Sequence, residues 1–387
     1  MRNPSFVRLA VVLGLLLLVV NLVPMAQDPT PNPFMSMGDL ERQLGLLEEE
    51  PLGDPETPWL QMYATEEMVD TSMYVTEGPW NICFSNASVG NNWRVSGFGV
   101  MNADVQALID EGKVAEFIVT DAGENADKQI SDIDDLLTRD CDIIIISPTS
   151  TEQLTPAVEK AAESGIPVIV FDRGVNTTDY TTFIHPIGGY AFGHVGATWL
   201  VDQIEGAGNV LALRILPGVD VLETRWLAAE QIFSANPDIS VVGVEFNDND
   251  PAKTKSIVTD YIQRVGQIDG VWMDAGETSV AVYEAFIDQG MPVPPITSED
   301  VNGWLKVWSD EELNSIAVTY PSFQWRTAIA AAVMILEGQP VPKEWVLPQP
   351  FVTNETVVDY VQPELPDTYY VFSSGATIEG YLDSLMD

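Results

Sequence analysis

From Trp80 onward, short apolar runs alternate with longer stretches in which apolar residues recur every three or four positions. The short runs predict strands and the longer stretches predict helices. The predicted strands are residues 81–85, 116–121, 142–147, 167–172, 209–213, 240–246, 270–274, 296–299 and 316–319. The predicted helices are residues 96–111, 126–138, 151–164, 193–203, 224–235, 251–265 and 278–289.

The alternation of strand and helix predicts parallel sheets with crossover helices. Residues 142–147 and 166–171 are apolar at nearly every position, as expected for strands covered by helices on both faces. Nine such strands over about 300 residues exceed what one compact core usually holds. The predicted fold class is therefore α/β, with two doubly wound parallel-sheet lobes.

The N-terminus has the layout of a secretory signal. Arg2 and Arg8 precede an apolar run over residues 9–20, and Ala26 stands before a polar stretch. Residues 1–26 are therefore predicted to be a signal peptide or an uncleaved anchor, and the rest of the chain to lie outside the cytoplasm. Residues 27–79 are rich in Pro, Glu, Asp and Met, and they predict an acidic tether, apart from a short helix around residues 40–50.

The chain of 387 residues has 58 Asp and Glu against 17 Lys and Arg, which gives a formal net charge of −41. Such a surface repels phosphate backbones and anionic lipid, so nucleic acid is excluded as a partner. The two cysteines, Cys83 and Cys141, cannot build a zinc site or a disulfide framework alone. They are interpreted as buried thiols, with one bond between them left open.

The sequence offers little support for an enzyme. The two histidines, His185 and His194, have no neighbouring His or Cys to complete a metal site, and no Gly-x-Ser-x-Gly elbow is present. No glycine-rich nucleotide motif follows a strand. We therefore expect no catalysis, no metal and no cofactor, although hydrolysis of glycosides by two carboxylates stays formally open because acids are abundant.

Ligands of open α/β sheets bind beyond the carboxyl ends of the strands, so the polar residues there are the site candidates. After the first strand stand Asn92, Trp93 and Arg94, where the alternative is a helix N-cap formed by Asn91 or Asn92. The fourth strand runs into Asp172 and Arg173, which suit sugar hydroxyls but could instead form a local ion pair. The candidates of the second lobe are Glu223, Arg225, Asp274, Asp300 and Thr319.

These stretches resemble the periplasmic sugar-binding proteins of ABC transporters, of the ribose-binding type. The resemblance spans about residues 80–350, and its best motif is Gly-Ile-Pro-Val-Ile-Val-Phe-Asp-Arg at residues 165–173. It implies that Asn92, Asp172, Arg173 and Asp300 contact a sugar, together with either Glu223 or Arg225. It also implies a type I periplasmic binding protein fold, in which three crossings form a hinge between the lobes.

The resemblance predicts domains of residues 80–187 plus 320–345 and 188–319 plus 346–387, the latter including a tail that stays unplaced. We expect a monomer that binds a monosaccharide between closing lobes and delivers it to an ABC permease, or else presents it to a chemoreceptor or kinase. The chain departs from the family pattern at Gly188-Gly189-Tyr190, where an Asp-Asn pair is usual, and by having Arg94 where a second stacking aromatic is usual. These departures leave the sugar undecided.

Overall fold

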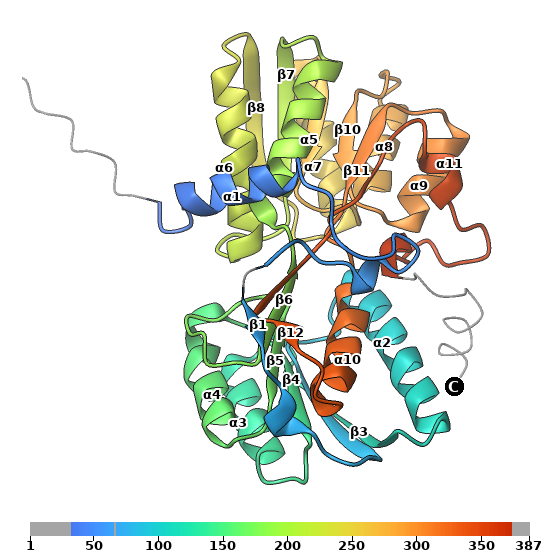
Figure 1. Cartoon of the computed structure of the whole chain (residues 1–387). Coiled ribbons are helices and arrows are strands. Elements are labelled where there is room, and N and C mark those ends of the chain that lie inside the picture. Colours follow the sequence, from blue (N-terminus) through green and yellow to red (C-terminus); the bar gives the residue numbers. More distant parts are fainter. Residues whose placement is uncertain (1–31, 66, 374–387) are drawn as a thin grey trace, which may run out of the picture. The chain divides into compact units, whose positions relative to one another are not determined.

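The computed structural model describes residues 32–65 and 67–373, so the predicted signal segment lies outside the described residues. Within these ranges the chain forms two six-stranded sheets (Figure 1). The first has the order β13-β6-β5-β4-β2-β3 and the second the order β14-β11-β10-β9-β7-β8. All pairs in the two sheets are parallel except β14 with β11. No helix in the described ranges is both long and apolar enough to cross a membrane.

The strands of the first sheet are β2 Trp80–Asn86, β3 Val114–Asp121, β4 Ile143–Ser147, β5 Val168–Phe171, β6 Thr182–Pro186 and β13 Glu344–Leu347. Those of the second are β7 Gly208–Arg214, β8 Ile239–Phe246, β9 Gly270–Met273, β10 Ile296–Ser298, β11 Ser315–Val318 and β14 Phe351–Val352. A separate pair joins β1 Met68–Val69 to β12 Val341–Pro342. The nine predicted strands are all present.

The helices are α1 Met37–Leu46, α2 Asn92–Asp110, α3 Ala126–Leu136, α4 Thr151–Glu163, α5 Gly189–Gln203, α6 Asp220–Ala235, α7 Pro251–Val265, α8 Ser279–Asp288, α9 Asn302–Asp310, α10 Gln324–Leu336 and α11 Val357–Tyr360. Short 3-10 turns are η1 Pro58–Leu60, η2 Ser72–Tyr74 and η3 Val371–Ser373. Polar caps fix several helix starts: Asn91 accepts a hydrogen bond from the Arg94 amide, and Ser150 accepts one from the Gln153 amide. Asn91 is thus a helix cap, as the alternative reading of that loop held.

Each sheet carries helices on both faces, and we call each sheet with its helices a lobe. In the first lobe, α2 and α10 cover one face and α3 and α4 cover the other. In the second lobe, α7, α8 and α9 cover one face while α5 and α6 cover the other. Both sheets are thus doubly wound, which confirms the predicted fold class.

The chain passes between the sheets three times: from β6 to α5, from β11 to α10 and from β13 to β14. The first passage falls at Gly188, whose positive φ of 137° favours glycine. The third falls after Leu347, which still pairs with Pro186 in the first sheet, two residues beyond the predicted boundary. These passages are the three crossings that the resemblance implied.

The sequence predicted an acidic tether over residues 27–79. The described residues between 34 and 79 instead pack on both lobes. Leu40 of α1 is buried with Tyr190 and Leu227 of the second lobe. Further along, the Tyr63 amide donates to the Val346 carbonyl, and Trp345 Nε1 donates to the Gln61 carbonyl. The anchors are few and irregularly spaced, so no sequence period reveals them.

Cys83 of β2 and Cys141, just before β4, form a disulfide with their Cα atoms 5.8 Å apart. The interpretation of these cysteines as buried thiols is therefore wrong. The sequence could not reveal the bond, because the two residues come together only when β2 pairs with β4 as its neighbour. A disulfide fits an oxidising compartment outside the cytoplasm.

Candidate functional site

The carboxyl ends of the two sheets meet through a contact between Asn92 and Glu277. Asn92 begins α2 after β2 of the first sheet, and Glu277 follows β9 of the second. The Asn92 backbone amide donates to Glu277 Oε1 over 3.1 Å, and its side-chain Nδ2 donates to Oε2 over 3.3 Å. The strand ends that the sequence singled out therefore face one another where the two lobes meet.

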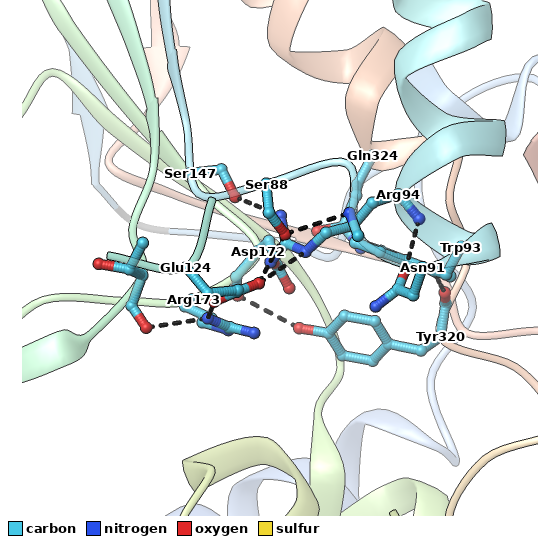
Figure 2. A network of polar contacts seen from close by, with 12 residues as sticks. Ser88, Asn91, Trp93, Arg94, Glu124, Ser147, Asp172, Arg173, Tyr320 and Gln324 are labelled. Carbon is cyan, nitrogen blue, oxygen red and sulfur yellow. Dashed lines mark hydrogen bonds and ion pairs between the residues drawn. The ribbon is translucent and has the colours of Figure 1, made fainter. Parts of the chain in front are cut away.

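On the first-lobe side, Arg94 is the centre of a buried network. Its Nη2 donates to Asp172 Oδ2 over 2.8 Å and its Nη1 donates to Ser147 Oγ over 3.1 Å. Figure 2 shows Arg94 reaching from α2 to these two strand-end residues, with the Tyr320 hydroxyl directed at the Asp172 carbonyl 3.2 Å away. Asp172 has a positive φ of 69°, so the backbone turns sharply where β5 ends.

Arg173 does not pair with its neighbour Asp172. Its Nη1 donates to the Thr149 carbonyl over 2.9 Å. The same atom donates to Glu124 Oε2 over 3.2 Å (Figure 2). The side chain is 23% exposed, whereas that of Arg94 is 2% exposed. The structure thus joins Arg94, and not Arg173, to the predicted aspartate.

On the second-lobe side, Arg225 of α6 is buried among acids and rings. Its Nη1 donates to Glu299 Oε1 over 3.1 Å and also to the Asp274 carbonyl. Its guanidinium lies 3.9 Å from the ring centroid of Phe192 and 5.2 Å from that of Tyr320, which stands at the second crossing. Arg225 and Glu299 thus form a buried ion pair on the second-lobe side.

The other second-lobe candidates support this arrangement. Glu223 accepts a hydrogen bond from the Gly218 amide over 2.7 Å, and it forms an ion pair with Arg214 Nη2 over 3.0 Å. Asp274 accepts from the Ile215 amide over 2.9 Å. Both residues therefore brace the turn between β7 and α6.

Two further candidates, Trp93 and Thr319, are engaged in packing. Trp93 Nε1 donates to the Tyr320 carbonyl over 2.7 Å, and the Trp93 ring lies in the core of the first lobe. Thr319 Oγ1 donates to the Pro350 carbonyl over 2.6 Å, which ties the second crossing to the third. Both contacts hold the inter-lobe segments together.

Asp300 points away from Arg225. Its Oδ2 accepts from the Phe372 amide over 2.8 Å, whereas the preceding Glu299 meets Arg225. Sequence reasoning missed Glu299 because two acids follow β10 and the pattern does not say which one faces the cleft. It also omitted Asn86, Glu277, Tyr320 and Tyr370. Asn86 and Glu277 could have been found from the sequence, because each is a polar residue at or just after the end of a strand.

Burial changes the protonation of the second-lobe acids. It raises the pKa of Asp274 to about 7 against the opposing effect of Arg225 and Arg214, and it raises the pKa of Asp300 to about 7. It also raises the pKa values of Glu299 and Glu277. Near neutral pH the Asp274 and Asp300 carboxyls can therefore donate as well as accept hydrogen bonds.

Several buried polar atoms near the strand ends have no hydrogen-bond partner within residues 32–65 and 67–373. They are Asn86 Nδ2 and Oδ1, Thr149 Oγ1, Arg214 Nε, Arg225 Nε, Asp274 Oδ2 and Asp300 Oδ1. Arg214 Nε and Asp274 Oδ2 lie 3.7 Å apart, within ion-pair distance but beyond a hydrogen bond. Buried polar atoms without partners are costly, so these favour a ligand rich in donors and acceptors.

Residues 82–340 match the model of the periplasmic binding protein domain, and the chain belongs to this family. The family assignment confirms the prediction of a binding protein and not an enzyme. The chain is similar to the ribose import binding protein RbsB of Bacillus subtilis, with 26% identity over 226 residues, which cover 58% of this chain and 73% of the relative. It is also similar to the xylitol-binding protein of Mycolicibacterium smegmatis, with 23% identity over 67% of this chain and 77% of that protein.

The fold matches that of solved solute-binding proteins. The ABC transporter solute binding protein from Thermobispora bispora superposes with a TM-score of 0.68 over 75% of this chain and 90% of its own, at 24% identity. At this identity the likeness speaks for the fold alone, and it agrees with the type I periplasmic binding protein fold.

Proposed function

We propose that this chain is an extracytoplasmic solute-binding protein that binds one monosaccharide or similar polyol between its two lobes and delivers it to an ABC permease. The observation that carries the proposal is that two buried networks, one from each lobe, meet at Tyr320. Arg94 with Asp172 stands on one side, and Arg225 with Glu299 stands on the other. Adjacent donors and acceptors of this kind suit neighbouring sugar hydroxyls, each of which both donates and accepts.

The ligand-contacting set that we propose combines the predicted residues with those that the structure adds. From the first lobe come Asn92 and Arg173, which line the same strand ends as Arg94 and Asp172. From the second come Arg225, Glu299 and Asp274. Of these, Arg225 Nε and Asp274 Oδ2 are buried without a hydrogen-bond partner within the described residues. Trp93, Glu223, Thr319 and Asp300 would act one step behind the ligand, because each is engaged with neighbouring protein groups.

The names of the two curated relatives support the ligand class, since one is a ribose import binding protein and the other a xylitol-binding protein. The word import in the first name favours delivery to a permease over presentation to a sensor. The disulfide between Cys83 and Cys141 supports a location outside the cytoplasm. We further propose that the chain acts as a monomer.

Thermal unfolding with a panel of D-ribose, D-glucose, D-fructose, xylitol and myo-inositol tests the proposal. A ligand at a hundredfold excess over its dissociation constant stabilises the folded state by about 2.7 kcal/mol, so the melting temperature should rise by several degrees. Amino acids and nucleosides serve as the control panel. A rise with that control panel and none with any sugar or polyol would overturn the proposal.

A further inference from the structure

The C-terminal residues 362–373, which we call the strap, are bound to the second lobe by a series of hydrogen bonds. The Asn302 side chain donates to the carbonyls of Gln362, Leu365 and Pro366, and the Asn302 amide donates to the Tyr369 carbonyl over 2.8 Å. Asp300 adds two more, because its carbonyl accepts from the Val371 amide and its Oδ2 from the Phe372 amide. The strap is therefore fixed along the edge of β10 and α9.

The same strap is bound to the helices of the first lobe. The Tyr370 amide donates to Ser96 Oγ of α2 over 3.3 Å, and the Phe323 amide, just before α10, donates to the Phe372 carbonyl over 3.0 Å. The hydroxyls of Ser322 and Ser373 also meet. One short segment thus spans both lobes beside the cleft.

Tyr370 is the strap residue whose hydroxyl lies among the acids where the two lobes meet. It is 2% exposed, and its hydroxyl lies 3.4 Å from Glu299 Oε2 and 3.5 Å from Glu277 Oε1. Both distances are long for an O–H···O hydrogen bond, and a phenol has one proton to give to two carboxyls. The hydroxyl therefore stands between the acid that meets Arg225 and the acid that meets Asn92, without a short bond to either.

The tyrosine stays a neutral donor. Burial raises the pKa of its phenol well above the ordinary value, and the nearby Glu277 and Glu299 raise it further. Its ring belongs to the core of the first lobe, while its backbone pairs with Val301 of the second. Neither the ring nor the hydroxyl can swing aside while both lobes hold the strap.

We propose that the strap forms one wall of the ligand cleft and that Tyr370 is its specificity-determining residue. Its hydroxyl bonds a ligand hydroxyl held by Glu277 and Glu299, and its ring closes the cleft to anything larger than a single sugar or polyol unit. A second sugar unit would require the strap to leave Asp300 and Phe323 together. This inference rests on the proposed function and adds to it the residue that sets the size limit, which lies outside the matched family domain of residues 82–340.

Two variants of the full chain test the inference, Tyr370→Phe and Tyr370→Ala, with Tyr360→Phe as the matched control. Tyr360 undergoes the same loss of a hydroxyl and packs on the strap through Phe372, with ring centroids 5.0 Å apart. Affinities are measured by calorimetry for the monosaccharide or polyol of the panel above that raises the melting temperature most, and for maltose and sucrose.

We expect Tyr370→Phe to weaken monosaccharide binding about tenfold, because the hydrogen bond between the Tyr370 hydroxyl and the ligand is lost. The melting temperature without ligand should be unchanged. Tyr360→Phe should bind like the wild type. Tyr370→Ala should reduce the preference for the monosaccharide over the disaccharides at least tenfold.

Wild-type affinity and preference in Tyr370→Phe would overturn the inference while leaving the proposed function intact, and this variant decides the matter if Tyr370→Ala does not fold. Binding of maltose or sucrose by the wild type as tightly as a monosaccharide would also overturn it. A wild type that binds no sugar or polyol of the panel would overturn the proposed function and this inference with it.

Discussion

Arg94 Nη2 lies 2.8 Å from Asp172 Oδ2, and the two side chains are 2% and 5% exposed. The pair joins the start of α2 to the end of β5, two elements whose sequence positions lie 78 residues apart. The sequence suggested that Asp172 and Arg173 act as neighbours, and the structure instead gives the aspartate a distant partner. The two arginines therefore have different roles, and their replacement should have different effects.

Arg94→Ala should lower the free energy of unfolding by about 3–5 kcal/mol, because it leaves the buried Asp172 carboxylate without its partner. Urea denaturation of the variant measures the loss. Arg139→Ala is the control, since Arg139 pairs with Asp135 on an exposed helix surface, and its effect should stay below about 0.5 kcal/mol. Equal losses in the two variants would contradict the buried-pair argument.

Arg173→Ala should leave the free energy of unfolding within about 1 kcal/mol of the wild type, because its partner Glu124 is partly exposed. Sugar affinity should fall by about one to two powers of ten if the guanidinium bonds a ligand hydroxyl. Calorimetric titration and denaturation of the same preparation give both quantities. A variant with lowered stability and undiminished affinity would remove Arg173 from the proposed site.

The pH dependence of stability should reflect the buried acids. The pKa values of Asp274 and Asp300 are raised to about 7 in the folded state, above those of unfolded aspartate, so the folded chain binds more protons between about pH 4 and 7. The free energy of unfolding should therefore fall as pH rises through this window, by up to about 1.4 kcal/mol per pH unit for each group.

Denaturation of the wild type and of Asp300→Asn at pH 5 and 7 measures this slope. The variant should show a shallower decline, because one of the two titrating groups is gone. Parallel slopes for the two proteins would mean that Asp300 does not take up a proton on folding.

The disulfide closes a loop of 58 residues in sequence separation. In the chain-entropy model such a cross-link stabilises the folded state by about 4 kcal/mol. The double variant Cys83→Ala, Cys141→Ala should have a free energy of unfolding about 2–5 kcal/mol below that of the wild type. Reductant present during unfolding should also lower the free energy of unfolding of the wild type. Insensitivity of the wild-type unfolding curve to reductant would show that the bond is not formed in solution.

Limited proteolysis distinguishes a docked N-terminal segment from a tether. Because Leu40, Tyr63 and their partners bury the segment, trypsin should cut after Arg42 slowly in the wild type. Leu40→Asp should release α1 from Tyr190 and Leu227 and speed this cut, whereas Met73→Asp, at a position that is 78% exposed, should not. Rapid cutting of the wild type after Arg42 would favour the tether.

The fold was predictable from sequence wherever a strand or helix carries a periodic apolar pattern. Helix α7 matches its predicted bounds because Asp250 caps it and Pro251 starts it, both of which are local signals. Helix α10 was missed because it is buried over most of its surface and shows no polar face. Strand β6 was missed because Thr182, His185 and Pro186 interrupt its apolar run.

The candidate site was predictable in its place but not in its pairings. Asp172 follows β5 directly and Arg225 lies in the helix after β7, and both positions follow from parallel topology alone. Which acid pairs with Arg225 depends on the twist of β10 and on the contacts of the strap. The local sequence around Glu299 indicates neither of these. Tyr370 lies far from every predicted strand end, so only the folded chain brings it to the cleft.

The two edge strands contributed by residues 344–352 bear on how the protein is made. Strand β13 completes the first sheet beside β6, and β14 completes the second beside β11. A polypeptide that emerges N-terminus first therefore has both sheets short of an edge strand until residues 344–352 have emerged. During that interval β6 and β11 present open backbone hydrogen-bonding groups, which other chains could pair with. Chaperones that shield nascent strands should for this reason matter more to the yield of this protein than to that of a protein whose sheets close in sequence order.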